Sequence, residues 1–506
     1  MVANTLRLHP KDNVIVALQA LEIGARLSVD ETLNIGSSIA KGHKIATSDI
    51  PKDQAILKYN QIIGFATKAI KAGEHVHTHN CGMGDFDRDY AFGTAAEPVS
   101  LVAPEKRRTF EGYKRSSGKA GTRNYIGLIA SVNCSATSVR FIADKIKQSG
   151  ELDNYPNIDG IVPIYHSTGC GMAASGEGFD NLKRVIKGYT EHANFGGILL
   201  MGLGCEVMQI KNIMQEEDEH QCLRQLTIQS SGGTSKAIAD GVEAVMQMLP
   251  TVNAVKRQTL PVSELTIALQ CGGSDAYSGI TANPALGRAA DLLVEQGGTA
   301  ILSETSEVFG AEHLLTRRAV SQSVGQKLID RIHWWEAYTA KHGGNMNNNP
   351  SPGNLAGGLT TILEKSLGAV AKGGSTPMQG VYLYAQQIDT KGFVFMDSPG
   401  YDPCSVTGQV AAGANIVCFT TGRGSAFGFK PVPSIKLATN SQMYQFQTED
   451  MDINCGDIID SGCSIDDKAH EILDYIIATA SGEQSKSEAL GYGDSEFVPW
   501  QIGAVM

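Results

Sequence analysis

Short apolar stretches separated by turn residues characterise the first 95 residues of the chain. A motif with a central Gly or Asp, flanked three residues away on each side by an apolar residue, occurs at 21–27, 39–45, 50–56 and 70–76. Gly and Asp at such positions favour tight turns between short strands. Because the four copies are irregularly spaced, we expect a compact β domain over residues 1–95 and not a solenoid.

The periodicity fades between residues 96 and 120, a segment that contains the charged run Glu105-Lys106-Arg107-Arg108. We expect a polar linker here. From residue 121 onward, short apolar runs alternate with stretches of helical periodicity. Strands are expected at 126–132, 160–164, 197–203 and 226–230, and helices at 136–148, 179–192 and 234–248.

A break at 249–263, which contains Pro250 and Pro261, separates a final unit. Strands of this unit are expected at 265–270, 299–303, 392–397 and 415–420. Alternating β and α elements predict parallel sheets covered by helices. The expected fold class is therefore α/β, with a β domain at 1–95, a linker at 96–120, a middle α/β domain at 121–255 and a C-terminal α/β domain at 256–506.

Composition and charge narrow the range of partners. The 506 residues are 42% hydrophobic and 19% charged, which is typical of a soluble globular protein with about three domains. A net charge of -11 argues against nucleic acid and anionic membranes as partners, because both need positive potential. No apolar run approaches the ~18 residues of a membrane span, and residues 1–13 lack the pattern of a signal peptide. We therefore expect a cytoplasmic protein with mostly reduced cysteines.

Polar residues follow almost every expected strand of the α/β part. Parallel sheets bind ligands at the carboxyl ends of their strands. One such loop alone would be an ordinary turn, but eight loops that carry Cys, His, Glu or Arg indicate a ligand site. The loops are Asn133-Cys134-Ser135, 166–171, Gly204-Cys205-Glu206, 230–233, 271–275, 304–307, 397–400 and 421–425.

The stretch Gly202-Leu203-Gly204 is similar to the start of a dinucleotide-binding motif. Position 207, where the third glycine would stand, is Val. Gln229 and Ser230 lie where an acidic residue would bind the ribose. We therefore do not expect NAD as a cofactor.

Histidine alternates with other residues at His75, His77 and His79, and Asn80 follows. In a β-strand, alternate side chains share a face, so the three imidazoles would line up. One such histidine would be a polar residue on an edge strand. Three favour a functional face that could bind a metal, move a proton or hold a carboxylate.

Eight motifs follow one another over nearly the whole chain, at 75–80, 121–125, 132–134, 202–206, 270–275, 281–284, 350–354 and 430–434. In this order they resemble the altronate/galactarate dehydratase family. The resemblance implies a β-clip domain at the N-terminus, a middle domain that contributes to a homodimer, and a Rossmann-like C-terminal sheet. It also implies a divalent metal, Fe²⁺ or Mn²⁺. Residues 110–113 and 132–137 are more similar to altronate than to galactarate dehydratases.

An enzyme of this family removes the proton next to a carboxylate and expels the neighbouring hydroxyl, which gives a 2-keto-3-deoxy acid. A metal stabilises the charge, while an acid and a base move protons. We expect D-altronate as the small-molecule substrate and 2-keto-3-deoxy-D-gluconate as the product. Candidates for the acid and base are His77 and His79, with His166 as a rival; for substrate binding Asn80, Arg123, Asn124, Ser274, Asn283 and Arg423; for the metal Asp275, Glu304 and Glu307.

Several alternatives remain open at this point. The substrate could be galactarate or another sugar acid, or the enzyme a sulfolactate-type lyase of the same family. Either arginine could form a structural salt bridge instead of binding substrate. Cys134, Cys170 and Cys205 could converge on an iron–sulfur cluster. A protein that only binds sugar acids is the non-enzymatic alternative.

Overall fold

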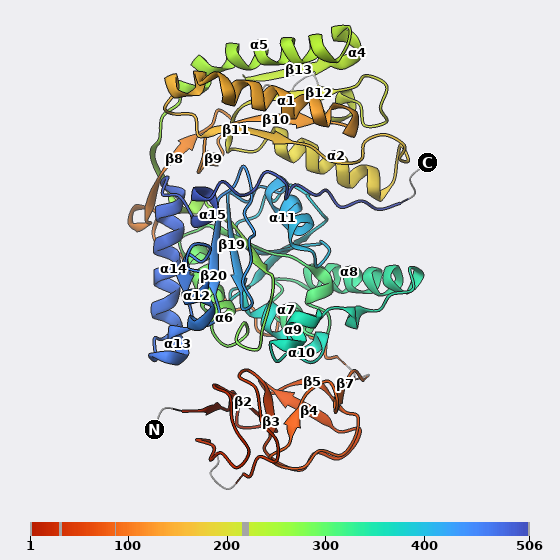
Figure 1. The fold of residues 1–506 in the computed structure, drawn as a ribbon, viewed down its shortest axis with the longest axis vertical. Coiled ribbons are helices and arrows are strands. Elements are labelled where there is room, and N and C mark those ends of the chain that lie inside the picture. Colours follow the sequence, from red (N-terminus) through yellow and green to blue (C-terminus); the bar gives the residue numbers. More distant parts are fainter. Residues whose placement is uncertain (1–2, 30–32, 85, 87, 215–221, 504–506) are drawn as a thin grey trace.

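The structure is a computed structural model that describes residues 3–29, 33–84, 86, 88–214 and 222–503. Three parts are stacked along the long axis of the molecule (Figure 1). The middle domain is at the top, the C-terminal α/β domain is in the centre, and the β domain is at the bottom. No helix in the described part of the chain is both long and apolar enough to cross a membrane.

The β domain contains two small antiparallel sheets. One has the order β1-β2-β3-β6 and the other β4-β5-β7. The expected turns are confirmed: Gly24, Gly42, Asp53 and Gly73, the central residues of the repeated motif, all have positive φ, between 65° and 84°. The strands are β1 (Thr5–Leu6), β2 (Val14–Ala17), β3 (Lys44–Ala46), β4 (Ala55–Lys58), β5 (Gln61–Ala66), β6 (His75–Val76) and β7 (Cys81–Gly82).

The expected histidine strand is shorter than the alternation suggests. β6 ends at Val76, and His77 begins a turn. Asn80 Oδ1 accepts a hydrogen bond from the His77 N–H at 2.9 Å, and the N–H groups of Asn80 and Cys81 donate to the His77 carbonyl. Asn80 therefore ends the strand, which its sequence pattern alone does not show.

The middle domain is a four-stranded parallel sheet with the order β11-β10-β12-β13. Helices α1 and α5 cover its outer face, and α2 lies between the sheet and the C-terminal domain (Figure 1). The strands are β10 (Tyr125–Ala130), β11 (Gly160–Ile164), β12 (Phe195–Gly202) and β13 (Leu223–Thr227), and the helices are α1 (Asn133–Ser149), α2 (Glu177–Thr190), α3 (Ile210–Ile213), α4 (Ile228–Ser231) and α5 (Thr234–Asn253).

Two predictions for this domain were wrong in detail. The strand expected at 226–230 ends at Thr227, because the chain turns there into α4, which stops at Gly232 with a φ of 87°. The break expected at 249–263 begins later, because α5 continues through Pro250 to Asn253.

The expected linker contains a strand. Residues Thr109–Lys114 form β8, whose Phe110, Gly112 and Tyr113 are buried. β8 pairs with β14 (Gln258–Pro261) and with β9 (Ala120–Gly121), so the chain enters and leaves the middle domain through one small sheet.

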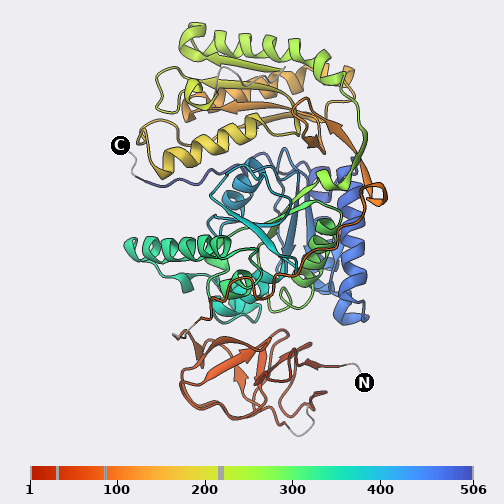
Figure 2. The same ribbon diagram turned by 180° about the vertical axis from the view of Figure 1, so that it is seen from behind.

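The segment before β8 runs along the C-terminal domain (Figure 2). The Ala95 N–H donates to the Arg317 carbonyl at 2.7 Å, and the Val102 N–H donates to the Glu295 carbonyl at 2.8 Å. The linker is therefore fixed to the C-terminal domain. It is not a flexible tether that would let the β domain move relative to that domain.

The C-terminal domain is built on a seven-stranded parallel sheet with the order β17-β18-β16-β15-β19-β20-β21. The strand order changes direction at β15, because β16 pairs with one edge of it and β19 with the other. Such a switch point leaves a crevice at the carboxyl ends of the two strands. The strands are β15 (Thr266–Cys271), β16 (Thr299–Leu302), β17 (Met378–Tyr382), β18 (Gly392–Met396), β19 (Ile416–Thr421), β20 (Ser434–Ala438) and β21 (Ile453–Asn454).

Helices cover both faces of this sheet, with α14 and α11 on opposite sides (Figure 1). The expected α/β class with parallel sheets and a small N-terminal β domain is confirmed. The Rossmann-like character of this sheet stays a prediction. The helices are α6 (Ala282–Glu295), α7 (Glu312–Thr316), α8 (Gln322–Lys341), α9 (Pro352–Ala356), α10 (Ile362–Ala371), α11 (Asp402–Ala411), α12 (Ser441–Phe446), α13 (Asp457–Asp460), α14 (Ile465–Ala480) and α15 (Lys486–Ala489).

Candidate active site

Buried ion pairs join the β domain to the C-terminal domain. Lys44 Nζ lies 2.8 Å from one Glu364 oxygen, and Lys58 Nζ lies 2.9 Å from the other. All three side chains are buried, and Lys44 also donates to the Gly358 carbonyl. Burial alone would raise the pKa of Glu364, but the two ammonium groups lower that pKa to about 2. Because a buried charge without a partner is costly, this triad holds the two domains in one arrangement.

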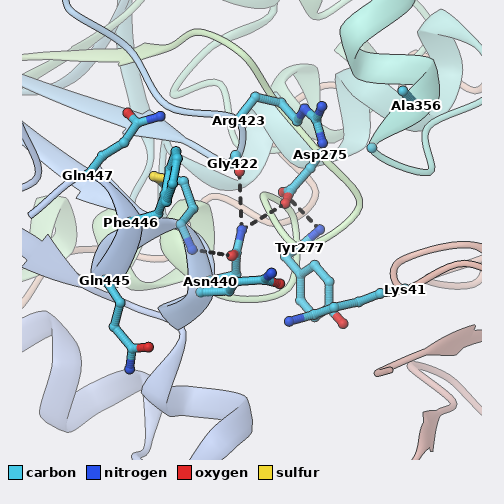
Figure 3. A pocket seen from close by; sticks show the side chains of 13 residues that line it. Lys41, Asp275, Tyr277, Ala356, Gly422, Arg423, Asn440, Gln445, Phe446 and Gln447 are labelled. Carbon is cyan, nitrogen blue, oxygen red and sulfur yellow. Dashed lines mark hydrogen bonds between the residues drawn. The ribbon is translucent and has the colours of Figure 1, made fainter. Parts of the chain in front are cut away.

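A cleft of about 740 Å³ lies beside this junction. The cleft opens at the carboxyl ends of β15 and β19, at the switch point of the sheet, and Lys41 of the β domain contributes to its wall. Its volume is that of a small-molecule site. Figure 3 shows Arg423 and Lys41 on the Ala356 side and Phe446 and Gln447 on the other.

Arg423 is the strongest candidate in the cleft for binding a carboxylate. Its side chain is exposed, and none of the described residues forms an ion pair with its guanidinium. A guanidinium binds a carboxylate through two parallel hydrogen bonds. Lys41, whose Nζ lies 5.2 Å from the centre of the Tyr277 ring, supplies a second positive charge.

Asp275 forms the floor of the cleft and is not available as a metal ligand. Its carboxylate accepts hydrogen bonds from the N–H groups of Tyr277 and Ser278, from the hydroxyls of Ser278 and Thr439, and from the Asn440 amide. Figure 3 shows the bonds from Tyr277 and Asn440. Five donors occupy the acceptor positions of one carboxylate. Asp275 therefore organises the loops after β15 and β20.

Four histidines of the β domain gather beside the cleft. Ring nitrogens of His43, His75 and His77 all lie within 4.8 Å of one another, and His43 Nδ1 is 2.9 Å from His75 Nε2. The His79 ring centre is 5.3 Å from that of His75. His43 Nε2 lies 3.4 Å from the carbonyl oxygen of Ala356, which lines the cleft. The expected grouping of imidazoles is therefore present, although His77 and His79 lie on a turn.

The sequence pattern missed His43, which is 32 residues from His75. β3 pairs antiparallel with β6, with Lys44 opposite Val76. Continued by one residue, this register brings His43 next to His77, and their ring centres are 4.6 Å apart. The signal available in the sequence was that His43 directly precedes an expected short strand.

The imidazoles fit a divalent metal ion. Burial, together with neighbouring positive groups, lowers the pKa of His75 and of His77 to about 4. Burial also lowers the pKa of His43. Neutral imidazole carries the lone pair that a metal needs, and imidazole ligands suit iron and other first-row ions. The buried Nδ1 of His77 has no hydrogen-bond partner among the described residues.

The expected carboxylate ligands form a different group. A sulfur or oxygen atom from each of Cys271, Glu304 and Glu307 lies within 4.8 Å of the others, and Asp275 is not part of this group. Lys372 Nζ is 2.9 Å from Cys271 Sγ and 3.3 Å from Glu304. Lys365 Nζ is 2.8 Å from Glu307. The two ammonium groups already neutralise this buried pocket, so it does not fit a divalent cation.

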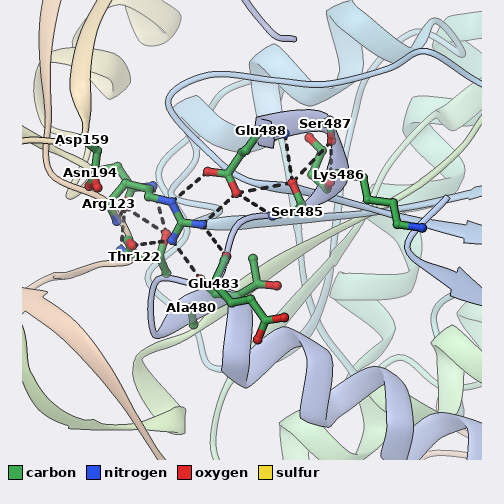
Figure 4. Close-up of polar contacts among 12 residues, drawn as sticks. Thr122, Arg123, Asp159, Asn194, Ala480, Glu483, Ser485, Lys486, Ser487 and Glu488 are labelled. Atoms are coloured by element: carbon green, nitrogen blue, oxygen red, sulfur yellow. Dashed lines mark hydrogen bonds and ion pairs between the residues drawn. The ribbon is translucent and has the colours of Figure 1, made fainter. Parts of the chain in front are cut away.

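Arg123 and Asn124 have structural partners. Arg123 forms a buried ion pair with Glu488 at 2.8 Å and donates to the carbonyl oxygens of Thr122, Thr479 and Glu483 (Figure 4). It thereby joins the start of the middle domain to α14 and α15. The Asn124 amide donates to the carbonyls of Asn157 and Val252. The side-chain donors of both residues are occupied by protein partners, so substrate binding by either residue stays a prediction that this arrangement disfavours.

Other expected residues also lie outside the cleft wall. His166 is buried in the middle domain, where its ring nitrogens contact the Ala130 carbonyl and the Thr168 N–H. Asn80 holds the turn after β6, and Asn283 bonds to Gly368 and Thr420. These three have structural roles. Ser274 is buried near Glu364 and Lys365, below the cleft.

Three family models match the chain in succession. The altronate/galactarate dehydratase SAF domain matches residues 3–84, the second domain of D-galactarate dehydratase/altronate hydrolase matches 112–253, and the C-terminal domain of D-galactarate/altronate dehydratase matches 262–505. These matches include the histidine cluster and the residues of the cleft.

Curated relatives match over almost their full lengths. The altronate dehydratase of Bacillus subtilis is 36% identical, over 94% of this chain and 95% of the relative. The altronate dehydratase of Escherichia coli is 34% identical, over 96% of each. The L-threo-forming galactarate dehydratase of E. coli is 34% identical, over 95% of this chain and 93% of the relative. The chain therefore belongs to the altronate/galactarate dehydratase family of hydro-lyases.

Proposed function

We propose that this protein dehydrates D-altronate to 2-keto-3-deoxy-D-gluconate in the cleft between the β domain and the C-terminal sheet. The observation that carries the proposal is the contact of His43 with Ala356, because it brings the imidazole cluster to the wall of a cleft that contains Arg423. The two altronate dehydratase relatives support altronate as the substrate.

Arg423 orients the substrate. Its guanidinium binds the altronate carboxylate through two hydrogen bonds, and Lys41 adds positive charge on the same side. The hydroxyl groups then face the amides of Gln442 and Gln447, which also line the cleft. This orientation directs the carbon next to the carboxylate toward the β domain.

The histidines divide into two roles. His43, His75 and His77 hold a divalent ion, because they are neutral at pH 7 and their nitrogens converge. Imidazole nitrogen favours Fe²⁺ over Mn²⁺. The bound ion supplies positive charge that stabilises the second negative charge developing on the substrate. His79, which is exposed at the edge of the cluster, exchanges a proton with the substrate.

A panel of hexonates and hexarates with added Fe²⁺ or Mn²⁺, scored for 2-keto-3-deoxy acid, tests the proposal. We expect altronate to have the highest kcat/KM. Rapid turnover of galactarate with none of altronate would overturn the choice of substrate and leave the reaction class intact. Full activity in enzyme shown to be free of metal would overturn the role of the ion.

Galactarate is the second candidate substrate. It has a carboxylate at each end, and the cleft offers two cations, Lys41 and Arg423. The galactarate dehydratase relative is 34% identical to this chain. If galactarate is the substrate, Lys41→Met should raise the KM for galactarate. The KM for altronate should depend mainly on Arg423.

We also propose a cytoplasmic homodimer that forms through the middle domain. All ten cysteines are free thiols, as expected in a reducing compartment. Phe141 on α1, the outer helix of the middle domain, is 44% exposed. Light scattering coupled to gel filtration tests the dimer, and Phe141→Glu should give a monomer.

A further inference from the structure

The exposed cysteines of this chain are concentrated in one place. Of ten cysteines, six are buried and Cys463 is half-buried. The three exposed ones, Cys134, Cys170 and Cys205, all lie in the middle domain. Each follows the carboxyl end of a strand, β10, β11 and β12 respectively. Exposed thiols are prone to oxidation, so three at one edge of a sheet require a reason.

The three loops that carry these cysteines are in direct contact. β11, β10 and β12 are parallel neighbours, so their carboxyl ends meet at the same edge. The Asn133 N–H donates to the Thr168 carbonyl at 2.9 Å, which joins the first loop to the second. The Met208 N–H donates to the Gly169 carbonyl at 3.0 Å, which joins the third loop to the second.

A buried carboxylate also fixes the third loop to the first. Glu206, which is 2% exposed, accepts hydrogen bonds from the Ser131 hydroxyl at 3.0 Å and from the N–H groups of Leu203 and Gly204. Asn133, Gly169 and Glu206 are each one residue from a cysteine. The backbone that carries the thiols is therefore held in a fixed arrangement.

Gly169 allows the close approach of the loops. Its φ is 97°, and a Cβ at this position would lie only 2.5 Å from the Ser131 carbonyl oxygen. Only glycine has both the conformation and the space that this contact requires. Helix α1 begins at Asn133, so the positive end of its dipole faces the same edge. That end favours a bound group with negative charge.

The spacing of the thiols selects the kind of metal group. Among the described residues, only the two groups given above have three ligand atoms within 4.8 Å of one another, and the three exposed cysteines are not such a group. At least one pair of their sulfurs is therefore more than 4.8 Å apart, which is wider than a single ion requires. An iron–sulfur cluster is larger, and thiolates bind it from several sides.

We propose that Cys134, Cys170 and Cys205 ligate a [4Fe–4S] cluster at the carboxyl edge of the middle sheet. Three protein thiolates bind three of its irons and leave the fourth without a cysteine ligand. That iron is a Lewis acid, open to a carboxylate or hydroxyl group from solution. This site lies in another domain than the histidine cluster, so it does not depend on the proposed altronate dehydration.

Anaerobic reconstitution of the full chain with Fe²⁺ and sulfide tests the proposal. We expect about four acid-labile sulfides and about four irons per chain in addition to iron bound at the histidine cluster, with broad visible absorption that decreases on reduction. Cys134→Ser, Cys170→Ser and Cys205→Ser should each lose most of this absorption and sulfide. Cys463→Ser, which removes a half-buried thiol from another domain, should retain both.

The three substituted side chains are exposed, so these variants should fold like the wild type, which circular dichroism checks. Iron bound at the histidine cluster carries no sulfide and stays in all three variants. Reconstitution that gives iron without sulfide would overturn the proposal. Unchanged sulfide and absorption in the three serine variants would overturn it as well.

Discussion

His43 Nδ1 and His75 Nε2 lie 2.9 Å apart, although 32 residues separate them in the chain. Antiparallel pairing of β3 with β6 brings them together, and burial lowers the pKa of both imidazoles. Two neutral rings at this distance form one hydrogen bond, or they turn their lone pairs toward a common ion.

Substitution of the proposed ligands should abolish metal binding. We expect His75→Ala and His77→Ala to weaken Fe²⁺ or Mn²⁺ affinity by at least about 100-fold, because each removes one nitrogen of three. Metal content after dialysis and calorimetric titration measure the loss. His470→Ala changes an exposed histidine outside the cluster and serves as the control. Unaltered affinity in both ligand variants would contradict the assignment.

His79→Ala should lower kcat by at least about 100-fold while metal content stays normal, because a positioned acid or base contributes this much. Its ring is exposed, so the thermal midpoint should hardly change. Steady-state kinetics on metal-loaded enzyme provide the test. If kcat stays within a few-fold of the wild type, the proton is exchanged by another group.

Arg423→Ala should raise the KM for altronate by about 10- to 100-fold, because it removes a charge-assisted pair of hydrogen bonds. Arg423→Lys should restore part of the loss. Arg140→Ala, at an exposed arginine on α1, is the matched control. A KM that is the same in both alanine variants would place the substrate carboxylate elsewhere.

Arg123→Gln, unlike Arg423→Ala, should lower the stability of the protein and leave the KM for altronate unchanged. It leaves Glu488 buried without its partner, so the free energy of unfolding should fall by about 3–5 kcal/mol. The KM of the folded fraction should stay near the wild-type value, since Arg123 does not reach the cleft. Denaturant titration measures the free energy of unfolding, and steady-state kinetics on the same sample measure the KM. A raised KM with normal stability would show that Arg123 binds the substrate.

Stability should fall as the pH decreases from about 6.5 to 4. Burial lowers the pKa of His166 and of His192 to about 4, so both are neutral in the folded protein and protonated in the unfolded chain over this range. The unfolded chain therefore binds more protons, and the free energy of unfolding rises with pH until it levels off above the unfolded pKa. Denaturant titrations at several pH values measure this slope, which His166→Gln should reduce. A slope of the opposite sign would show that other groups dominate.

Local patterns predicted the elements better than the site. The strand at 160–164 and the start of the helix at 234 agree with the structure, because apolar periodicity is a local property. The end of the histidine strand depends on the Asn80 side chain, and β8 depends on a partner about 150 residues away. Neither of these two contacts can be recognised from a short stretch of neighbouring residues in the sequence.

The two arginines show the same limit for the site. Arg123 and Arg423 each lie close to a glycine and to one end of an expected strand, yet only Arg123 has a buried carboxylate partner. That partner, Glu488, lies 365 residues further along the chain. Residue type indicates which groups can bind a carboxylate, whereas tertiary packing decides which of them remain free to do so.

The buried Lys44–Lys58–Glu364 triad has a consequence for the path of the substrate. A swing of the β domain away from the body would expose or unpair three charges, while the segment before β8 stays bound to the C-terminal domain. Substrate and product therefore pass the solvent-facing wall at α12, where Phe446 is 87% exposed. With an entrance that needs no moving domain, solvent viscosity should affect only the diffusion of substrate and product and not a step of domain opening.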